Sequence, residues 1–137
     1  MSLASLDHCS IRTVKLEETR NFYVNILGMT DGDRPDFPFP GAWLYIGDVA
    51  VIHLIAVDPK DPSGLLFHLG GELSAEKLQG SGAVDHIAFQ AKNPEQLIDR
   101  LKKNNCAYRE REVPNMNIFQ VFTEDPNGVM IELNYSN

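Results

Sequence analysis

Four side chains that could bind a metal ion or transfer a proton occupy matching places in this chain: His8, His53, His86 and Glu132. Residues 6–11 (LDHCSI) recur as residues 84–89 (VDHIAF), an offset of 78 residues (86 − 8). Residues 51–54 (VIHL) recur as residues 130–133 (MIEL), an offset of 79 residues (132 − 53). Two offsets that agree within one residue indicate a duplicated supersecondary unit, with one of the four side chains near the start of each copy and another near its end.

Imidazole nitrogens and carboxylate oxygens are ligands for divalent iron, manganese, zinc and nickel. All four side chains are therefore candidate metal ligands. For His53 a packing role is the alternative, since on its expected strand face it is the one polar group among Val49, Val51 and Ile55, and such a histidine is often buried and bonded to a backbone carbonyl. The repeat favours the ligand interpretation, because His53 occupies the position that Glu132 holds in the other copy.

The first copy, residues 5–57, has the pattern of a β-α-β-β-β unit. Alternating side chains predict a strand over 6–13 that puts His8, Ser10 and Arg12 on one face. Apolar residues at three- and four-residue steps predict a helix over 16–27, ended by Gly28. The proline-rich segment 31–41 is expected to be an ordered loop that could wall a pocket. A hairpin across Gly47-Asp48 follows, with strands 43–46 and 49–57.

The second copy, residues 83–135, repeats this order after a linker at 58–82 that is rich in proline and glycine. One helical turn near 74–78 is expected in the linker, and His68 is expected to be a surface or packing residue. Strand 84–90 precedes a helix that Asn93 can cap and Pro94 can begin. A strand near 107–111 and a hairpin of 118–123 and 129–134, turned by Asp-Pro-Asn-Gly at 125–128, complete the copy.

Composition sets outer limits on function. A chain of 137 residues with 43% hydrophobic content is long enough for one compact domain, residues 1–137. A formal net charge of −7 argues against nucleic acid as a partner, because that binding needs clustered lysine and arginine. No apolar run approaches the length of a membrane span, and the first residues lack the features of a signal peptide. Cys9 and Cys106 have no metal or redox spacing. We therefore expect a cytoplasmic protein without a membrane partner.

These features together resemble the vicinal oxygen chelate superfamily, which includes glyoxalase I, fosfomycin- and bleomycin-resistance proteins, methylmalonyl-CoA epimerase and extradiol dioxygenases. The resemblance rests on two β-α-β-β-β modules, a histidine that opens each, a glutamate on the last strand and the Asp-Pro-Asn-Gly turn shortly before it, and it covers essentially the whole chain. It implies an α+β fold in which two repeated βαβββ modules, with curved mixed sheets, form a metal-containing cleft. It also implies a small-molecule substrate and a homodimer.

In the family, first- and last-strand residues hold one divalent metal per site, and they map to His8, His86 and Glu132. Iron(II), manganese(II), zinc(II) and nickel(II) all suit this set, whose open positions can take two substrate oxygens. The metal would then stabilise negative charge on a diol, hydroxy-carbonyl or enediolate. The resemblance thus predicts a glyoxalase-like lyase or isomerase, with Glu132 and His53 as the catalytic residues.

His53 leaves the reaction open. In glyoxalase-like members the corresponding residue is usually a fourth ligand, so two of six metal positions remain for substrate. In extradiol dioxygenases it is a histidine that works as acid and base without binding the metal, but those enzymes carry a tyrosine where this chain has Phe122. A third alternative is a drug-binding resistance protein without catalysis, although such proteins typically lack the ligand set.

Strand alternation also predicts which residues face the substrate. Those sharing a face with His8 and His86 are Ser10, Arg12, Ala88 and Gln90, and the resemblance adds Phe122, which stands where the dioxygenases carry their tyrosine. Arg12 is the expected partner of a substrate anion, and Ile87 and Phe89 should lie beneath a helix. Whether the site closes within one chain or between two chains is left open, because both arrangements occur in the family.

Overall fold

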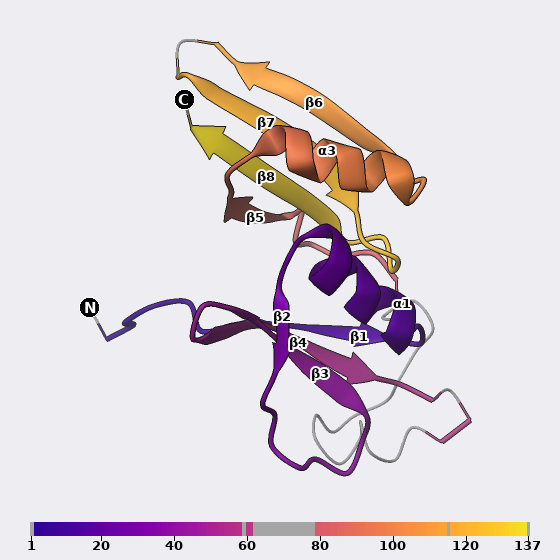
Figure 1. Cartoon of the computed structure of the whole chain (residues 1–137). Coiled ribbons are helices and arrows are strands. Elements are labelled where there is room, and N and C mark those ends of the chain that lie inside the picture. Colours follow the sequence, from indigo (N-terminus) through magenta and orange to yellow (C-terminus); the bar gives the residue numbers. More distant parts are fainter. Residues whose placement is uncertain (1, 59, 62–78, 115, 137) are drawn as a thin grey trace. The chain divides into compact units, whose positions relative to one another are not determined.

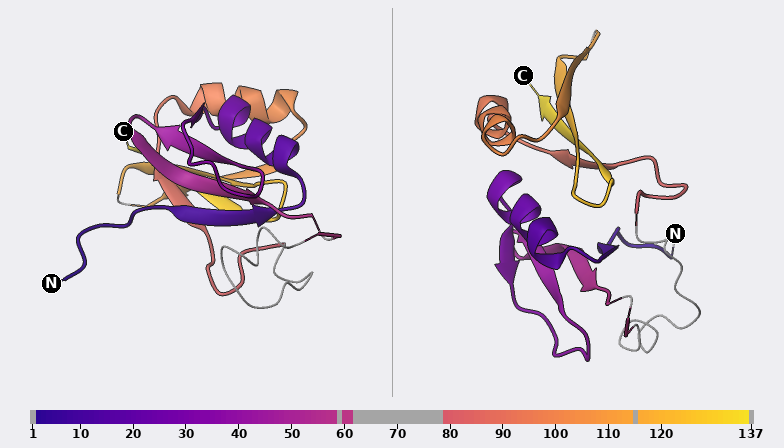
Figure 2. Two further views of the ribbon diagram at one scale, coloured as in Figure 1. Left: turned by 90° about the horizontal axis from the view of Figure 1, so that it is seen from below. Right: turned by 90° about the vertical axis from the view of Figure 1, so that its right-hand side faces the viewer.

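The structure is a computed structural model that describes residues 2–58, 60–61, 79–114 and 116–136. It divides into two compact units, residues 1–78 and 79–137, and the described strands form one four-stranded sheet in each (Figures 1 and 2). The strands of the first unit are β1 (Cys9–Thr13), β2 (Thr30–Gly32), β3 (Gly41–Ile46) and β4 (Val49–Ala56). Those of the second are β5 (Ile87–Gln90), β6 (Tyr108–Val113), β7 (Ile118–Glu124) and β8 (Met130–Ser136).

Both sheets have the same topology, β1-β4-β3-β2 in the first and β5-β8-β7-β6 in the second. The first and last strands of each unit are parallel neighbours, and the remaining pairs are antiparallel. A parallel pair needs a crossover connection, which is made by α1 (Leu16–Asn21) with the π-helical turn η1 (Phe22–Ile26) in the first unit and by α3 (Pro94–Lys103) in the second. The two predicted βαβββ modules are confirmed, although β2 lies partly in the segment 31–41 that the sequence predicted to be a loop.

The strand registers match between the units residue by residue. Ser10 of β1 pairs with His53 of β4, and Ala88 of β5 pairs with Glu132 of β8. His53 and Glu132 therefore occupy equivalent positions in the two sheets, as the sequence repeat predicts. The histidines that open the copies, His8 and His86, lie just before β1 and β5, because these strands begin later than the alternation indicates.

The helical segment of the first unit packs its apolar side on one face of the sheet. Thr19, Phe22, Tyr23 and Ile26 are buried, and α1 contacts β3 and β4. The segment ends as predicted at Gly28, whose φ of 89° is left-handed, and the amide of Met29 reaches back to the carbonyl of Tyr23. The π-helical turn is a difference from the expected regular α-helix.

In the second unit α3 lies over one face of its sheet (Figure 1) and buries Leu97 and Leu101. Pro94 begins the helix as expected, but the side chain of Asn93 makes no capping hydrogen bond. Asn93 has a left-handed backbone with φ of 61°, whereas a side-chain cap needs an extended residue at this position. The predicted cap is thus wrong in its mechanism.

Turn chemistry explains the hairpin that carries Glu132. Oδ1 of Asp125 accepts hydrogen bonds from the amides of Asn127 and Val129, and Gly128 adopts a φ of 82°. The linker expectations for residues 74–78 and His68 lie outside the described residues. In the part of the chain that is described, no helix has the length and apolarity needed to cross a membrane.

Gly41 permits β3 and β4 to approach closely at the point where β3 begins and β4 ends. A Cβ at this position would lie 2.3 Å from the carbonyl oxygen of Leu54 and 3.2 Å from Nε of Arg34. We expect Gly41→Ala to lower the free energy of unfolding by about 1–3 kcal/mol, because the backbone oxygen cannot yield without shifting the strands. Urea unfolding followed by circular dichroism measures this, and an unchanged midpoint and slope would contradict the packing described.

Candidate metal centre

The four candidate ligands are divided equally between the units: His8 and His53 in the first, His86 and Glu132 in the second. Within the described ranges, no three His, Cys, Asp or Glu side chains gather into one metal-binding group. Each unit thus has two candidate ligands.

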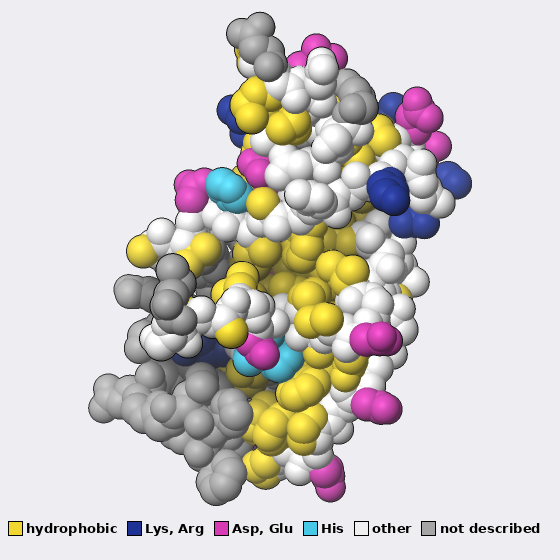
Figure 3. All heavy atoms as spheres, turned by 90° about the vertical axis from the view of Figure 1, so that its left-hand side faces the viewer, with side chains coloured by type: hydrophobic (Ala, Val, Ile, Leu, Met, Phe, Trp, Pro, Cys, Tyr) yellow, Lys and Arg dark blue, Asp and Glu magenta, His cyan; other side chains and the backbone are white. Residues whose placement is uncertain are grey.

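Both opening histidines are oriented by the aspartate that precedes them. Nδ1–H of His8 donates to Oδ2 of Asp7 over 2.6 Å, and Nδ1–H of His86 donates to Oδ2 of Asp85 over 2.7 Å. Histidine side chains are seen at the surface beside acidic and hydrophobic side chains in the space-filling view (Figure 3). A carboxylate on one nitrogen fixes the tautomer and leaves the other nitrogen, Nε2, as the donor for a metal. The donor chemistry therefore fits a metal at both repeat positions.

His86 and Glu132 face one another in the second unit. Nε2 of His86 lies 3.6 Å from Oε1 of Glu132. His86 and Glu132 are therefore close enough together that both could hold one divalent ion. The hydrogen bond from His86 to Asp85 is the main reason that the pKa of His86 is raised, with Glu132 adding to the effect.

A chain of hydrogen bonds fixes the other oxygen of Glu132. Nδ2 of Asn134 donates to Oε2 of Glu132 over 2.9 Å, Nε2 of Gln120 donates to Oδ1 of Asn134 over 2.8 Å, and Nε of Arg111 donates to Oε1 of Gln120 over 2.8 Å. We call Arg111, Gln120 and Asn134 the Glu132 relay. Every bond runs from donor to acceptor in the same direction, so a cation at one end supports a carboxylate at the other. The relay holds Oε2 and leaves Oε1 directed toward His86.

His53 is held in a stack of three rings. Its ring lies 3.9 Å from that of Trp43, with 12° between the planes, and 3.7 Å from that of His8, with 11° between the planes. Nε2–H donates to the carbonyl oxygen of Ala50 over 3.1 Å. Because a carbonyl can only accept, this bond leaves Nδ1 with the free lone pair. Burial and a backbone hydrogen bond are what the packing interpretation of His53 predicts, so both interpretations remain.

The electrostatics of His53 favour its neutral form. Burial is the main cause that lowers its pKa, and the neighbouring His8 lowers it further. A neutral imidazole can bind a metal or accept a proton. The stack sets one geometric condition: lone pairs in two parallel ring planes cannot converge on one ion, so joint binding by His8 and His53 requires one ring to turn. His53 is held by Trp43 and Ala50, which makes His8 the ring more free to rotate.

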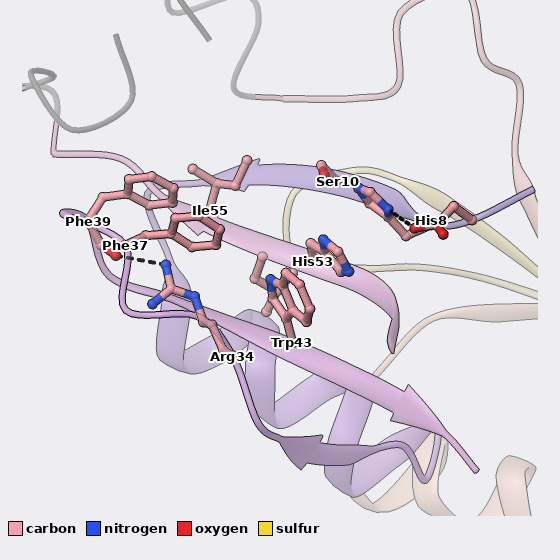
Figure 4. A pocket seen from close by; sticks show the side chains of 10 residues that line it. His8, Ser10, Arg34, Phe37, Phe39, Trp43, His53 and Ile55 are labelled. Atoms are coloured by element: carbon pink, nitrogen blue, oxygen red, sulfur yellow. Dashed lines mark hydrogen bonds and ion pairs between the residues drawn. The ribbon is translucent and has the colours of Figure 1, made fainter. Parts of the chain in front are cut away.

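A cavity of about 240 Å³ opens beside this stack (Figure 4). Its lining contains two groups, a polar one at the histidines and an aromatic one from the proline-rich loop and β3: Asp7, His8, Ser10, Arg34, Phe37, Phe39, Trp43, His53, Leu54 and Ile55. The loop thus walls a pocket, as its sequence predicts. Of the predicted substrate-facing residues in this unit, Ser10 lines the cavity, and Arg12 lies two residues further along β1, opposite Ile55.

The predicted residues of the second unit gather on the sheet face that carries Glu132. Ala88 and Gln90 are exposed on β5, opposite Glu132 and Asn134. Phe122 pairs with Glu132 and is 8% exposed, with the guanidinium of Arg109 4.4 Å from its ring centroid. Contact of these residues with a substrate remains a prediction.

Several residues of these sites were missed by reasoning from the sequence. Asp7 and Asp85 recur with the histidines, so the repeat itself contained the signal. Arg34 and Trp43 reach the cavity from a loop and a neighbouring strand, and the relay joins three strands. Residues that become neighbours only through folding cannot be recognised from their spacing in the sequence.

The sequence matches the profile of the Glyoxalase/Bleomycin resistance protein/Dioxygenase superfamily over residues 5–133. The chain belongs to this superfamily. Members typically use a divalent metal, bind small molecules and often form dimers. The predicted family and fold are therefore confirmed.

Individual relatives are distant. "Glyoxylase I 4" of Arabidopsis thaliana is 29% identical over 140 residues, which cover 97% of this chain and 71% of the relative. A lactoylglutathione lyase of Neisseria meningitidis is 25% identical over 130 residues, covering 91% of this chain and 86% of the relative. The fosfomycin resistance protein FosX of Listeria monocytogenes has a TM-score of 0.69 at 16% identity, covering 98% of this chain and 95% of that one. This last likeness shows the superfamily fold alone.

Proposed function

We propose that this superfamily member is a divalent-metal-dependent lyase or isomerase of the glyoxalase type, which binds a small substrate through two neighbouring oxygens. The observation that carries the proposal is the repeated aspartate–histidine contact, which leaves Nε2 free in both His8 and His86. Glu132, anchored at Oε2 with Oε1 near His86, adds the anionic ligand. The two sequence relatives, "Glyoxylase I 4" and a lactoylglutathione lyase, support the choice of reaction class.

His8, His86 and Glu132 would hold the metal, which could be iron(II), manganese(II), zinc(II) or nickel(II), with His53 as a fourth ligand. When bound, the metal would polarise the substrate oxygens and stabilise the negative charge that develops on them. The proton that leaves the substrate carbon needs a carboxylate or a neutral imidazole as acceptor. Glu132 is the carboxylate of this kind, and His53, whose lowered pKa favours the neutral ring, could take the role only where its Nδ1 does not bind the metal.

The two ligand pairs must meet in one site for this proposal to hold. We propose that they do so in a homodimer, either within each chain or by exchange of units between chains. Mixing the inactive variants His8→Ala and Glu132→Gln distinguishes these arrangements. Exchanged units would restore activity, because one of the two sites in a mixed dimer is then intact. Sites within single chains would stay inactive after mixing.

The Glu132 relay gives a testable expectation for metal affinity. We expect Gln120→Leu to weaken metal binding about 10- to 100-fold, because Asn134 then loses its partner and Glu132 its fixed orientation. Isothermal titration with zinc measures the change, and Arg111→Gln should follow in the same direction. The matched control is Arg109→Gln, which removes an equivalent charge over Phe122 without interrupting the relay. Equal losses in Arg109→Gln and Arg111→Gln would show that the relay does not position Glu132.

An extradiol ring-cleaving dioxygenase with iron(II) is the second candidate. One observation favours it: His53 is bonded to Ala50 and stacked on Trp43, an arrangement that suits an acid–base group outside the metal shell. Phe122 counts against it, since its ring offers no hydrogen-bond donor. A drug-binding protein without catalysis would use the cavity beside His53 and need no metal.

One comparison separates these functions. Protein purified without chelator is loaded anaerobically with each metal and given hemithioacetals and catechols side by side. We expect turnover of a hemithioacetal without oxygen uptake. Oxygen uptake on a catechol with iron(II) would instead support the dioxygenase, and tight drug binding with no bound metal would support the binding protein. We also propose a cytoplasmic location for the protein. The two cysteines are free thiols, which agrees with a reducing compartment.

A further inference from the structure

The cavity in the first unit has an aromatic end and a polar end (Figure 4). We propose that it binds a planar apolar substituent of the substrate, an aryl group attached next to the two oxygens that chelate the metal. This inference rests on the proposed function and adds a substrate class to it. The proposal follows from the aromatic walls of the cavity, from its size and from the polar groups at its other end.

The walls at the aromatic end are apolar and are already arranged around flat rings. Phe37 and Phe39 lie parallel, with centroids 5.3 Å apart and 4° between their planes, and Phe37 lies 6.4 Å from Trp43. Phe39 and Ile55 are buried in one hydrophobic cluster, and Phe37 packs against it. Aromatic walls favour an aromatic guest, because offset and edge-to-face contacts add to the burial of apolar area.

Arg34 stabilises this wall. Its guanidinium lies 5.2 Å from the centroid of Phe37 and 5.3 Å from that of Phe39, and Nη2 donates to the carbonyl of Phe39 over 2.8 Å. The charge is thus engaged with the loop that carries both rings, and Pro35, Pro38 and Pro40 restrict the same loop. A wall fixed before binding loses little entropy when a ligand enters.

The size of the cavity limits its occupant. An engineered apolar cavity of about 150 Å³ in another protein binds benzene, and this cavity has about 240 Å³. One aromatic ring and a few linking atoms therefore fit, whereas a longer peptide-like substituent would extend beyond the cavity.

The polar end of the cavity determines the orientation of the substrate. Polar groups of His8, His53 and Ser10 line the end opposite Phe37 and Phe39 (Figure 4). A substrate with its ring at the aromatic end and its oxygens at the polar end presents the oxygens to the candidate metal ligands. The reverse orientation would bury oxygens among rings that offer no hydrogen bonds.

The first experiment needs no metal. The chain has one tryptophan, and Trp43 lines the cavity, so its fluorescence reports on occupancy. Chelator-treated protein is titrated with benzyl alcohol and, in parallel, with 1-propanol. We expect the fluorescence to change saturably with benzyl alcohol. The affinity of Phe37→Ala for benzyl alcohol should be at least about fivefold lower than that of the wild type, since one wall of the cavity is lost. Phe37→Leu keeps most of the apolar volume and replaces Phe37→Ala in this test if Phe37→Ala does not fold. The matched control is Phe119→Ala, because Phe119 is a half-buried phenylalanine of the second unit.

The second experiment links the cavity to the chelated substrate. Zinc-loaded protein is titrated with benzohydroxamate and acetohydroxamate, which present the same two oxygens and differ in a phenyl or a methyl group. We expect benzohydroxamate to bind at least about tenfold more tightly, and Phe37→Leu to reduce that preference while Phe119→Ala leaves it unchanged.

The outcomes are distinguishable. Absence of a saturable response to benzyl alcohol, or equal affinity for the two hydroxamates, would overturn the assignment of the cavity to an aryl group. If zinc-loaded protein binds neither hydroxamate while the response to benzyl alcohol is intact, the proposed metal chemistry is wrong. The assignment of a chelated substrate to the cavity is then overturned with it.

Discussion

Replacing Glu132 by Gln is expected to lower divalent metal affinity by about 100-fold or more. The change removes the anionic ligand, and the relay adds a second reason for the loss. Asn134 donates to Oε2 of Glu132, so a glutamine there would turn its oxygen toward Asn134. Its amide hydrogens would then point at the position of the metal, where a donor repels the cation. Loss of a first ligand should exceed the roughly 10- to 100-fold effect of losing an outer partner.

Elemental analysis of protein purified without chelator, followed by zinc titration, measures this loss. Glu124→Gln is the matched control, because Glu124 is an exposed carboxylate at the end of β7 in the same sheet. Undiminished metal in Glu132→Gln, with unchanged circular dichroism, would remove Glu132 from the ligand set.

Replacing His53 is the second change for which we expect a large effect. We expect His53→Ala to reduce turnover by about 100-fold or more, since either of its proposed roles, ligand or acid–base group, is essential to the reaction. We expect coordination, because His53 and Glu132 occupy equivalent positions in their sheets. His53→Ala should then also weaken metal binding, and His53→Gln, which offers an oxygen, should retain more metal than His53→Ala.

Metal content and turnover measured on the same preparations separate the two roles. Full metal content in His53→Ala together with lost turnover would assign His53 to acid–base chemistry. Trp43 and Ala50 would then be the groups that hold it outside the metal shell. Oxygen uptake on a catechol by the wild-type protein would then support the dioxygenase in place of the lyase or isomerase.

The duplication explains why so much of the fold could be predicted. A strand face and a helical stripe are local patterns that the repeat tested twice, and the glycine cap of the first copy is a local pattern as well. The Asp-Pro-Asn-Gly turn at 125–128 specified its hairpin through the hydrogen bonds of Asp125. Patterns of this kind depend on neighbouring residues alone, so they can be recognised from the chain.

What could not be predicted depends on backbone detail or on contacts between strands. Asn93 has the residue type of a helix cap but a left-handed backbone, which sequence does not reveal. The relay joins residues of β6, β7 and β8, which are adjacent only through sheet pairing. Arg34 lines the cavity from a loop whose path no periodicity describes.

We propose that one divalent ion is bound by imidazoles and a carboxylate of this protein. X-ray absorption at the zinc edge of the loaded protein tests it most directly, with the bound zinc quantified in the same sample. We expect one zinc per chain, with imidazole scattering from at least two histidines and oxygen scattering at about 2.0–2.2 Å. Zinc bound without imidazole scattering, or with a spectrum unchanged in His86→Ala, would contradict the account.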